Sequence, residues 1–342
     1  MNDELQAHIR EHGIDFVGVT TVAPFRVGPE GTVVDPHQTM PEARSLVVTG
    51  FYTYTGEVSR PSTPGVPRGR FGPWTRLSLP AMSYQAGVLS AFFRERGYAA
   101  QTGTDVPAKP AAVRAGWGVY GRNSLIHAPG VGSYVKIQTC LTDAPLKAVE
   151  QPIETSDCGQ CRACVDACPT GALREPYCLD RARCICAWLW GRPAPRELRP
   201  AVGAHLLRCS YCLEACPLNH DLQPRESVPF DLDGPTSSPE LIPLLSASEE
   251  ELRQALPSFV LSAGAETLRR NVALALGNSG DPAAVPALAA ALCDSVPAVR
   301  TYAAWALGRL GGPEARAALA AALAVEEEAP VQEELRWALG EG

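Results

Sequence analysis

The sequence predicts a multidomain protein of the α+β class, and three features of its 342 residues lead to this expectation. Residues 1–150 alternate between patterns typical of helices and of strands. Residues 151–222 hold most of the cysteines, and from residue 240 onward the chain is rich in alanine and repeats itself. Because domains usually contain about 100–150 residues, three blocks of such different composition predict three domains.

The first block, residues 1–150, is expected to be an α/β domain. Apolar periodicity and β-branched runs place its elements along the chain. Helices are expected over residues 4–12, 77–96 and 109–115, and strands over residues 14–21, 43–52, 98–103 and 134–141. Gly97 is expected to end the second helix.

A glycine-rich stretch, residues 115–133, lies inside this block and begins Ala115-Gly-Trp-Gly-Val-Tyr-Gly-Arg-Asn123. Its glycines would allow the backbone to approach a large flat ligand closely, whereas a set of tight turns is the alternative interpretation. The stretch is not a G-x-G-x-x-G fingerprint in a strand–helix–strand context, so no dinucleotide cofactor is expected.

The cysteines between residues 158 and 216 form two sets with the spacing of iron–sulfur ligands. The first set reads C-x2-C-x2-C-x3-C-P, as in two-cluster bacterial ferredoxins, and the second repeats the C-x2-C-x3-C-P ending after one upstream cysteine. Two 4Fe–4S clusters need eight thiolates, and the two sets supply Cys158, Cys161, Cys164, Cys168, Cys184, Cys209, Cys212 and Cys216. Residues 151–222 are therefore expected to form a bacterial ferredoxin-like double 4Fe–4S domain.

In the ferredoxin pattern the last cysteine of each set serves the other cluster. Cys216 is then expected to complete the first cluster, and Cys168 the second. Zinc and disulfides are the alternatives. Zinc sites do not need the C-x3-C-P ending, and disulfides need an oxidising compartment, to which nothing in the sequence points.

Four cysteines remain outside these sets: Cys140, Cys178, Cys186 and Cys293. Cys186 lies two residues from Cys184 and competes with it as a ligand. Cys140 and Cys293 lie in apolar surroundings, where a free cysteine is usually a small core residue.

Charge and hydropathy exclude several classes of protein. The net charge is −7, so no global basic field favours nucleic acid or an anionic membrane. The N-terminus has no apolar signal core, and no run of about 18 apolar residues suggests a membrane span. Abundant thiols without an export signal predict a reducing, cytoplasmic location.

The third block, residues 240–342, contains an internal repeat. Residues 272–292 align with residues 303–323, so that Gly277 and Gly308 are 31 residues apart. Alanine-rich paired helices at this period predict HEAT-like repeats that form a small α-solenoid. The block carries 14 acidic and 7 basic residues, and its net charge of −7 equals that of the whole chain.

The order of motifs over residues 100–220 resembles that of the epoxyqueuosine reductases, the cobalamin-dependent enzymes that complete queuosine in tRNA. The matching pieces are residues 115–123, 132–133 and 142–146, the first cysteine set with 169–173, residues 180–185, and the second set through Asn219. In that family the cysteine after the element corresponding to residues 180–183 is a cluster ligand, which favours Cys184 over Cys186. The family also ends in HEAT-like repeats, so the resemblance covers most of the chain.

The resemblance implies a reductase in which a base-off cobalamin lies between the α/β domain and the clusters. Electrons would pass from a low-potential donor, flavodoxin or ferredoxin, through the clusters to cobalt, and then to a small-molecule or nucleoside-type substrate. The implied cofactor-binding residues are Gly116, Gly118, Tyr120, Arg122, Asn123, Gly132 and Ser133. The alternatives are an electron-transfer protein of ferredoxin type, without cobalamin or active site, and a scaffold with structural clusters.

The sequence departs from the family at the proton donor. The family places an acidic donor upstream of its Ala-Gly-Leu-Gly, and counting back without gaps from Ala115 reaches Thr102, which cannot serve. Asp105 can serve if the loop is shorter, although a turn residue before Pro107 is the alternative. Lys109, Tyr120 and His127 are the other candidates.

The sequence also departs from the family in its charge. A tRNA stem-loop requires basic surface, which the acidic C-terminal block does not offer. Arg68, Arg70 and Arg76 would meet phosphates, cofactor amides or an anionic substrate, or lie in a solvated loop. We therefore expect weak tRNA binding and a smaller substrate.

Overall fold

The structure is a computed structural model that describes residues 1–342 except 29, 58, 73–74, 150–157, 175–176, 232–237, 257 and 342. The chain divides into two compact units, each discontinuous in sequence. Unit 1 comprises Met1–Gly56, Leu77–Asp180 and Tyr211–Asp231, and unit 2 comprises Glu57–Arg76, Arg181–Ser210 and Leu232–Gly342. The cysteine-rich block is therefore shared between the units. The predicted boundary at residues 150–151 lies outside the described residues, and the division into three domains stays a prediction.

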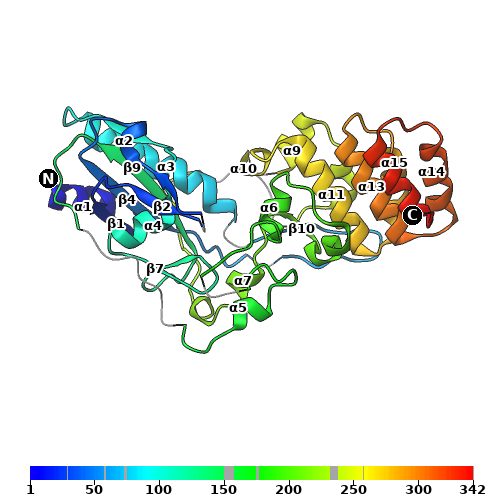
Figure 1. Ribbon diagram of the computed structural model, residues 1–342, viewed down its shortest axis with the longest axis horizontal. Coiled ribbons are helices and arrows are strands. Elements are labelled where there is room, and N and C mark those ends of the chain that lie inside the picture. Colours follow the sequence, from blue (N-terminus) through cyan, green and yellow to red (C-terminus); the bar gives the residue numbers. More distant parts are fainter. Residues whose placement is uncertain are drawn as a thin grey trace. The chain divides into compact units, whose positions relative to one another are not determined.

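A four-stranded sheet forms the centre of unit 1 (Figure 1). Its order is β1-β4-β9-β6, and every pairing is antiparallel. The strands are β1 (Phe16–Thr20), β4 (Ser45–Tyr52), β6 (Ala100–Thr102) and β9 (Val135–Thr142), each within two residues of its predicted range. Antiparallel pairing corrects the expectation of an α/β domain in the strict sense: helices on an antiparallel sheet define an α+β arrangement.

Alternate residues of β4 supply the cores on the two faces of this sheet. Leu46 and Val48 belong to one core, and Val47 and Phe51 to the other, because successive strand side chains point to opposite faces. Cys140 is fully buried in the second core, as predicted. The helices of unit 1 that contribute to these cores are α1 (Asn2–Glu11), α3 (Thr75–Arg94, from Leu77) and α4 (Ala108–Arg114).

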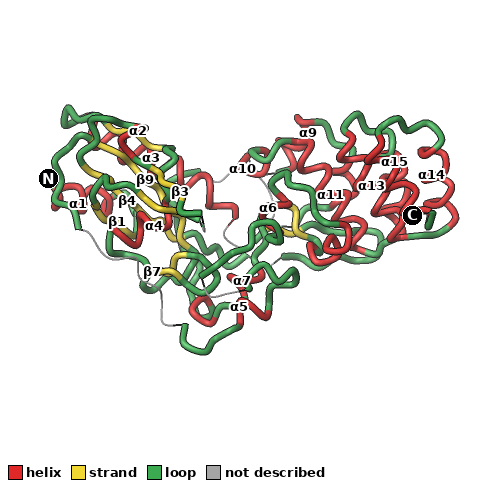
Figure 2. The backbone as a smooth tube through the Cα atoms, in the orientation of Figure 1, coloured by secondary structure: helices red, strands yellow, loops and turns green. Residues whose placement is uncertain are grey.

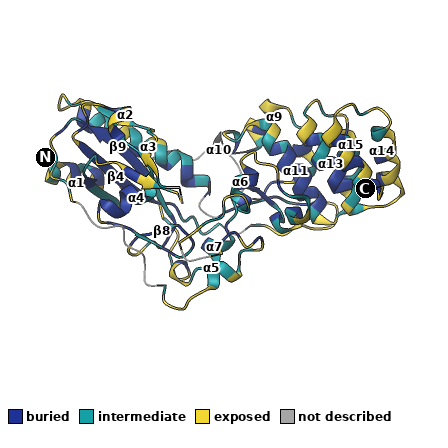
Figure 3. Ribbon diagram, in the orientation of Figure 1, coloured by how far each residue is buried: buried dark blue, intermediate teal, exposed yellow. Residues whose placement is uncertain are grey.

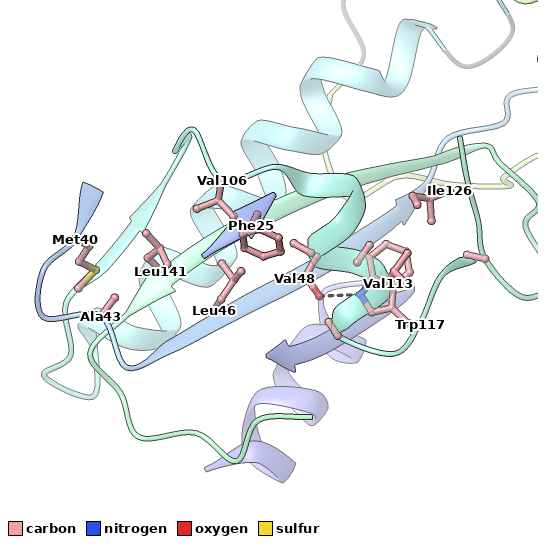
Figure 4. Close-up of a cluster of buried hydrophobic side chains, with 14 residues drawn as sticks. Phe25, Met40, Ala43, Leu46, Val48, Val106, Val113, Trp117, Ile126 and Leu141 are labelled. Atoms are coloured by element: carbon pink, nitrogen blue, oxygen red, sulfur yellow. Dashed lines mark hydrogen bonds between the residues drawn. The ribbon is translucent and has the colours of Figure 1, made fainter. Parts of the chain in front are cut away.

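Trp117 anchors the glycine-rich stretch to the sheet (Figure 4). Its Nε1 donates a hydrogen bond to the carbonyl oxygen of Val48 at 3.2 Å, and its ring stacks on Phe16 with centroids 5.3 Å apart. A Cβ added at Gly50 would lie 2.8 Å from the indole ring, so the strand admits the tryptophan only because glycine stands there. These contacts hold Trp117 in place, and they therefore anchor the start of the segment that follows it.

Shorter elements complete unit 1. They escaped prediction because two to four residues carry too little periodicity to be recognised. They are β2 (Phe25–Val27), β3 (Thr32–Val34), α2 (Pro36–Thr39), β7 (Val119–Tyr120), β8 (Ile126–His127), α5 (Ala163–Asp166), α7 (Tyr211–Glu214) and the 3-10 turn η2 (Pro217–Asn219).

Unit 2 is mainly helical (Figure 2). Helix α13 packs against both α11 and α15, with α12 and α14 between them in the chain. A Cβ at Gly277 would lie 2.7 Å from Ala306, and one at Gly308 would lie 2.8 Å from Ala338. The 31-residue glycine spacing thus marks where neighbouring repeats pack closest. The helices are α11 (Ala265–Ser279), α12 (Val285–Ala291), α13 (Pro297–Leu310), α14 (Pro313–Leu323) and α15 (Ala329–Leu339).

The first solenoid helix is tied to the cysteine-bearing segment of unit 2. Asn271 is fully buried, and its Nδ2 donates to the carbonyl oxygens of Leu189 and Leu206, both at 2.9 Å. Figure 3 shows α11 and α13 as mostly buried. The remaining elements are β5 (Arg70–Phe71), α6 (Ile185–Leu189), η1 (Arg196–Val202), β10 (His205–Leu207), α8 (Leu241–Leu245), α9 (Glu249–Ala255), α10 (Ser258–Leu261) and η3 (Pro282–Ala284).

Two further expectations concern Cys293 and membrane-spanning helices. Cys293 is exposed, which corrects the prediction of a core cysteine: the apolar neighbours face the solenoid interior, whereas Cys293 follows the end of α12. Within the described ranges, no helix is long and apolar enough to cross a bilayer. The cytoplasmic location stays a prediction.

Candidate iron–sulfur and cofactor site

Four of the predicted cluster ligands gather in unit 1. Burial raises the pKa of the Cys164 thiol, and Cys216, Cys158 and Cys161 add to this effect through their proximity. Burial likewise raises the pKa of Cys216, with Cys158 and Cys161 acting in the same direction. Cys216 thus lies with the first three cysteines although it is 52 residues downstream of Cys164. This is the grouping that the ferredoxin crossover pattern predicts.

The spacing of these thiols bears on what they can hold. Within the part of the chain that the structure describes, no three His, Cys, Asp or Glu side chains are grouped so that they could ligate one metal ion. A 4Fe–4S cubane does not require its thiolates to converge on one ion, because each thiolate binds a separate iron atom at a corner of the cage. The assignment of the cluster ligands stays a prediction, supported by the grouping of the thiols.

In unit 2, Cys186 lies against Cys184 and Cys209. Its sulfur accepts a hydrogen bond from the main-chain N–H of Cys209 at 3.2 Å. A hydrogen bond from Cys186 lowers the pKa of Cys184 to about 6, whereas the same bond and burial raise the pKa of Cys186. The two cysteines are thus neighbours in the structure, and the choice of Cys184 as the ligand stays a prediction. Cys168 and Cys212 belong to unit 1, so the assembly of the full second set stays a prediction.

Paired serine substitutions separate these two cysteines. Cys184→Ser is expected to lower the iron content of the anaerobically reconstituted protein by about four atoms, because one cubane loses a ligand. Cys186→Ser is expected to keep the full complement, because the serine hydroxyl still donates a hydrogen bond. Iron and sulfide analysis checks both variants. The opposite pattern would assign the ligand role to Cys186.

The glycine-rich stretch forms the β7–β8 hairpin and its flanking turns. A Cβ at Gly118 would lie 2.5 Å from the side chain of Ile126, and one at Gly121 would lie 2.3 Å from Nε2 of His127. Close packing within the hairpin therefore requires glycine at these two positions, and a part of Gly118 in binding a cofactor stays a prediction. Gly116 is different: it is exposed and adopts a φ of +83° at the turn after α4.

Side-chain amides tie the hairpin region to the second cysteine arm, residues 211–219. Nδ2 of Asn219 donates to the carbonyl oxygen of Leu213 and to Oγ of Ser133, both at 2.8 Å. Nδ2 of Asn123 reaches the carbonyl oxygen of Cys212 at 3.4 Å. Asn123 and Ser133, which the resemblance implies as cofactor-binding residues, are thus engaged with the arm that carries Cys212 and Cys216.

Arg122 links the same hairpin to the first cysteine set. Its Nη2 donates to the carbonyl oxygen of Gly159 at 2.9 Å, between Cys158 and Cys161. Its own carbonyl oxygen accepts a hydrogen bond from the N–H of Tyr177 at 3.2 Å. The hairpin therefore contacts both cysteine-bearing segments of unit 1.

Three polar atoms of the hairpin are buried without a hydrogen-bond partner among the described residues: Nε of Arg122, Oγ of Ser124 and Nδ1 of His127. Ser124 also has a φ of +60°, a conformation that residues other than glycine seldom adopt. A buried polar group without a partner costs about 1–3 kcal/mol. A hairpin that carries three of them fits a polar ligand that would supply the partners.

The proton-donor candidates occupy different environments. Asp105 is exposed in the loop between β6 and α4. Nζ of Lys109 donates to the carbonyl oxygen of Ser124 at 2.7 Å, which engages it with the hairpin. Burial raises the pKa of Tyr120 to about 12 and lowers the pKa of His127. Tyr120 therefore keeps its proton near neutral pH, and His127 is uncharged.

Two arginines of the 60–76 segment form ion pairs within unit 2. Arg68 forms an ion pair with Glu240 at 2.8 Å, and Arg76 forms one with Glu57 at 2.9 Å. Arg70 begins β5, which pairs with β10. Partners of opposite charge reduce the attraction of Arg68 and Arg76 for phosphates.

Sequence reasoning missed the contacts of a segment that follows the second cysteine arm, residues 221–227, which we call the strap. Nη1 of Arg225 pairs with Asp15 at 2.8 Å, and its Nη2 donates to the carbonyl oxygen of Gly13 at 2.6 Å. The guanidinium also lies over the ring of Phe51, 3.9 Å from its centroid. An open cavity of about 520 Å³ adjoins the strap and includes Tyr52 in its lining. Local sequence patterns gave no sign of these contacts, because Asp15 and Gly13 lie 210 and 212 residues from Arg225.

Comparison with known families defines the class of the protein. Residues 157–219 match a family described as a 4Fe-4S double cluster binding domain, and residues 256–340 match HEAT repeats. The chain therefore combines a segment similar to double 4Fe-4S cluster domains with a segment similar to HEAT repeats, which supports the class of iron–sulfur proteins. Both matches agree with the predicted segments.

The chain is, more particularly, similar to the epoxyqueuosine reductases. The enzyme of Escherichia coli strain K12 is 40% identical over 175 residues, which are 50% of this chain and 45% of that protein. The enzyme of Bacillus subtilis strain 168 is 28% identical over 317 residues, 84% of this chain and 82% of that protein. The match thus spans less than half of the E. coli relative but most of the B. subtilis one.

Solved epoxyqueuosine reductases share the fold along the chain. A structure from B. subtilis, with its catalytic aspartate loop swung out of the active site, has a TM-score of 0.85 and 28% identity. Another, with a tRNA-Tyr epoxyqueuosine-modified tRNA stem loop, has a TM-score of 0.84 and 27% identity. Each comparison covers 99% of this chain and 98% of the solved chain. The mixed helix and strand architecture predicted from the sequence is confirmed.

Proposed function

We propose that this protein is an iron–sulfur, cobalamin-dependent reductase of the epoxyqueuosine reductase type that acts on a nucleoside-type substrate. The observation that carries the proposal is the likeness to solved epoxyqueuosine reductases over 99% of the chain. The grouping of Cys216 with Cys158, Cys161 and Cys164 supports the iron–sulfur part. A low-potential flavodoxin or ferredoxin is the proposed electron donor.

The β7–β8 hairpin supports the cobalamin part. Cobalamin presents amide groups around a flat ring, and these suit the unpartnered atoms of Arg122, Ser124 and His127. Gly116 and Tyr120 belong to the same stretch and are not fully buried, so they are proposed as contacts. When bound, the cofactor supplies a strongly reducing metal centre, while the protein supplies orientation and a dry environment.

The other four cofactor-binding residues that the resemblance implies are proposed to support this contact surface. Asn123 and Ser133 hold the hairpin region against the second cysteine arm through hydrogen bonds. Gly118 and Gly132 admit close packing that a side chain would prevent. We propose that these four residues place the contact surface rather than touch the cofactor.

Asp105 is the proposed proton donor. It is exposed on a loop of unit 1, and a solved relative has a catalytic aspartate on a loop that swings out of the active site. The other candidates are less suited. Lys109 is engaged by Ser124, and Tyr120, whose pKa is raised to about 12 by burial, holds its proton firmly.

Anaerobic purification with cobalamin supplied tests the proposal. We expect the visible absorption of a corrinoid together with about eight iron and eight sulfide per chain, because two cubanes contain that many. A protein that holds iron and sulfide but no corrinoid would support the electron-transfer alternative. A protein without iron would overturn the whole assignment.

A binding experiment with an anticodon stem-loop distinguishes a tRNA substrate from a smaller one. One solved relative holds such a stem loop, whereas the acidic solenoid and the ion pairs of Arg68 and Arg76 favour weak binding here. An anisotropy titration at ~150 mM salt measures this directly. Sub-micromolar binding that falls steeply with added salt would establish a tRNA substrate. Weak binding with turnover of a free nucleoside would establish a smaller one.

A further inference from the structure

Two stretches of unit 2 carry cysteines and lie against each other. Residues 184–189 begin with Cys184 and contain helix α6, whereas residues 205–209 contain β10 and end with Cys209. They meet directly, because α6 packs against β10 and the N–H of Cys209 donates to Sγ of Cys186 at 3.2 Å. The main chain of α6 is bonded within its helix, and that of β10 pairs with β5. The relative position of the two cysteine stretches therefore depends largely on side chains.

The side chain of Asn271, in helix α11, joins the two cysteine stretches. Its Nδ2 donates to the carbonyl oxygen of Leu189 at the end of α6 and to that of Leu206 within β10, both at 2.9 Å. Asn271 is fully buried, so water does not compete for these hydrogen bonds. Leu189 lies three residues after Cys186. Leu206 lies three residues before Cys209. One amide group thus links the main chains beside both cysteines.

Arg270, the preceding residue of α11, holds this amide in one orientation. Its Nε and Nη2 donate to Oδ1 of Asn271 at 3.2 and 2.7 Å. Its Nη2 also donates to the carbonyl oxygen of Trp188, and its Nη1 donates to that of Arg192 at 3.4 Å. A rotated amide would turn its NH2 group toward the guanidinium and leave two buried carbonyl groups without a donor, which is costly. The donors of Asn271 therefore stay directed at the two cysteine stretches.

Trp188 connects these contacts to both sides of Cys184. The N–H of Trp188 donates to the carbonyl oxygen of Cys184 at 3.4 Å, and its Nε1 donates to that of Ala182 at 2.9 Å. The residue is only 2% exposed. The main chain before and after Cys184 is thus bonded to a residue whose own carbonyl oxygen is held by Arg270.

We propose that Arg270 and Asn271 are positioning residues for the second cluster, so that the solenoid takes part in iron–sulfur binding. They fix Cys184 and Cys209, the predicted ligands that unit 2 contributes, relative to each other. Contacts behind the ligands of a metal site orient those ligands, and losing one commonly lowers metal affinity by about 10–100-fold. The inference rests on the iron–sulfur part of the proposed function and is independent of cobalamin and substrate.

Iron release from the anaerobically reconstituted full-length chain tests this role. In Asn271→Ala we expect about four of about eight iron atoms to pass to a ferrous chelator ~10-fold faster than in the unmodified protein, or faster still. The other four should leave at the original rate. Amide hydrogen exchange of the same sample should be faster in residues 185–189 and 205–207, because both stretches lose their shared donor.

Asn278→Ala is the matched control. Asn278 belongs to the same helix, and its Nδ2 also donates to two carbonyl oxygens, those of Arg199 and Gly203 at 3.0 and 3.1 Å. Both acceptors belong to one turn, η1 and its end, so this amide does not join the two cysteine stretches. The melting temperature should fall about as far as in Asn271→Ala, because the same number of hydrogen bonds is lost. All iron should nevertheless leave at the original rate.

Asn271→Asp separates the two ends of the amide. Its carboxylate still accepts from Arg270 but cannot donate to Leu189 and Leu206, so the same selective iron release is expected. This variant decides if Asn271→Ala does not fold. If neither folds, native-state hydrogen exchange of the unmodified protein decides: α6, β10 and α11 should open with one common free energy. Opening of α6 or β10 while α11 stays closed would count against the proposal.

Three further results would overturn the proposal: unchanged iron release in the Asn271 variants, equal acceleration for all iron atoms, or the same acceleration in Asn278→Ala. Each would show that the amide has no specific effect on the second cluster. Failure of the unmodified chain to hold iron would instead contradict the proposed function itself.

Discussion

Cys161→Ala is expected to lower the iron content of the anaerobically reconstituted protein from about eight to about four atoms per chain, because one cubane loses a ligand. Cys161 and Cys158 lie in the short loop before α5, and Cys164, which is grouped with them, lies in α5 itself. Binding of metal to such loops is coupled to their folding, so the variant should also unfold at a lower temperature. Iron and sulfide analysis with a thermal melt measures both effects.

The double variant Cys161→Ala, Cys212→Ala is the sharper form of this test, since it removes one ligand from each predicted cluster. Nearly all iron should be lost. Cys293→Ala is the matched control, because Cys293 is exposed, lies in the solenoid and belongs to neither set. It should keep about eight iron atoms. A full iron complement in the double variant would contradict the ligand assignment.

Asp105→Asn is expected to keep the clusters and the cofactor yet to lower turnover by about 100-fold or more, the usual effect of removing a general acid. Asparagine matches the size and polarity of aspartate but has no acidic proton. Asp105 is exposed, so the change should leave the melting temperature unaltered. Steady-state turnover of an epoxyqueuosine-type substrate, with a corrinoid spectrum of the same sample, measures the effect.

Asp3→Asn is a suitable control for this experiment. Asp3 is also an exposed acid of unit 1, in the first turn of α1, and it has no proposed part in the reaction. Its turnover should match that of the unmodified protein. Equal turnover in Asp105→Asn would remove Asp105 from the mechanism and direct the search to Lys109, Tyr120 and His127.

Local patterns predicted the long elements and the cysteine sets well. Helix α3 was recognised from its apolar spacing despite Pro80, and β4 from its continuous apolar run. The glycine period of the solenoid was visible because Gly277 and Gly308 each meet an alanine of the next repeat. In these cases the residues that determine the structure are neighbours in sequence or recur at a fixed interval.

Contacts between distant segments were beyond such reasoning. Asn219 looked like the last residue of a cysteine motif, yet its partner Ser133 lies 86 residues upstream. Gly118 and Gly121 were expected to leave space for a ligand, and the sequence did not show that a Cβ at either position would meet Ile126 or His127. The sequence shows that a residue is small or polar, but the atom that faces it is determined by the fold.

The discontinuity of unit 1 bears on how the chain reaches its native state. The sheet residues leave the ribosome first. Asp15 cannot pair with Arg225 until Arg225 has been synthesised, and Phe51 cannot pack against Phe230, with ring centroids 5.5 Å apart, until Phe230 has been synthesised. Contacts of such long range form late and leave apolar surface open in the meantime. Cys158 likewise cannot group with Cys216 until Cys216 has been synthesised. Unit 1 therefore cannot complete its core before residue 231 has left the ribosome, and until then part of its apolar surface stays exposed.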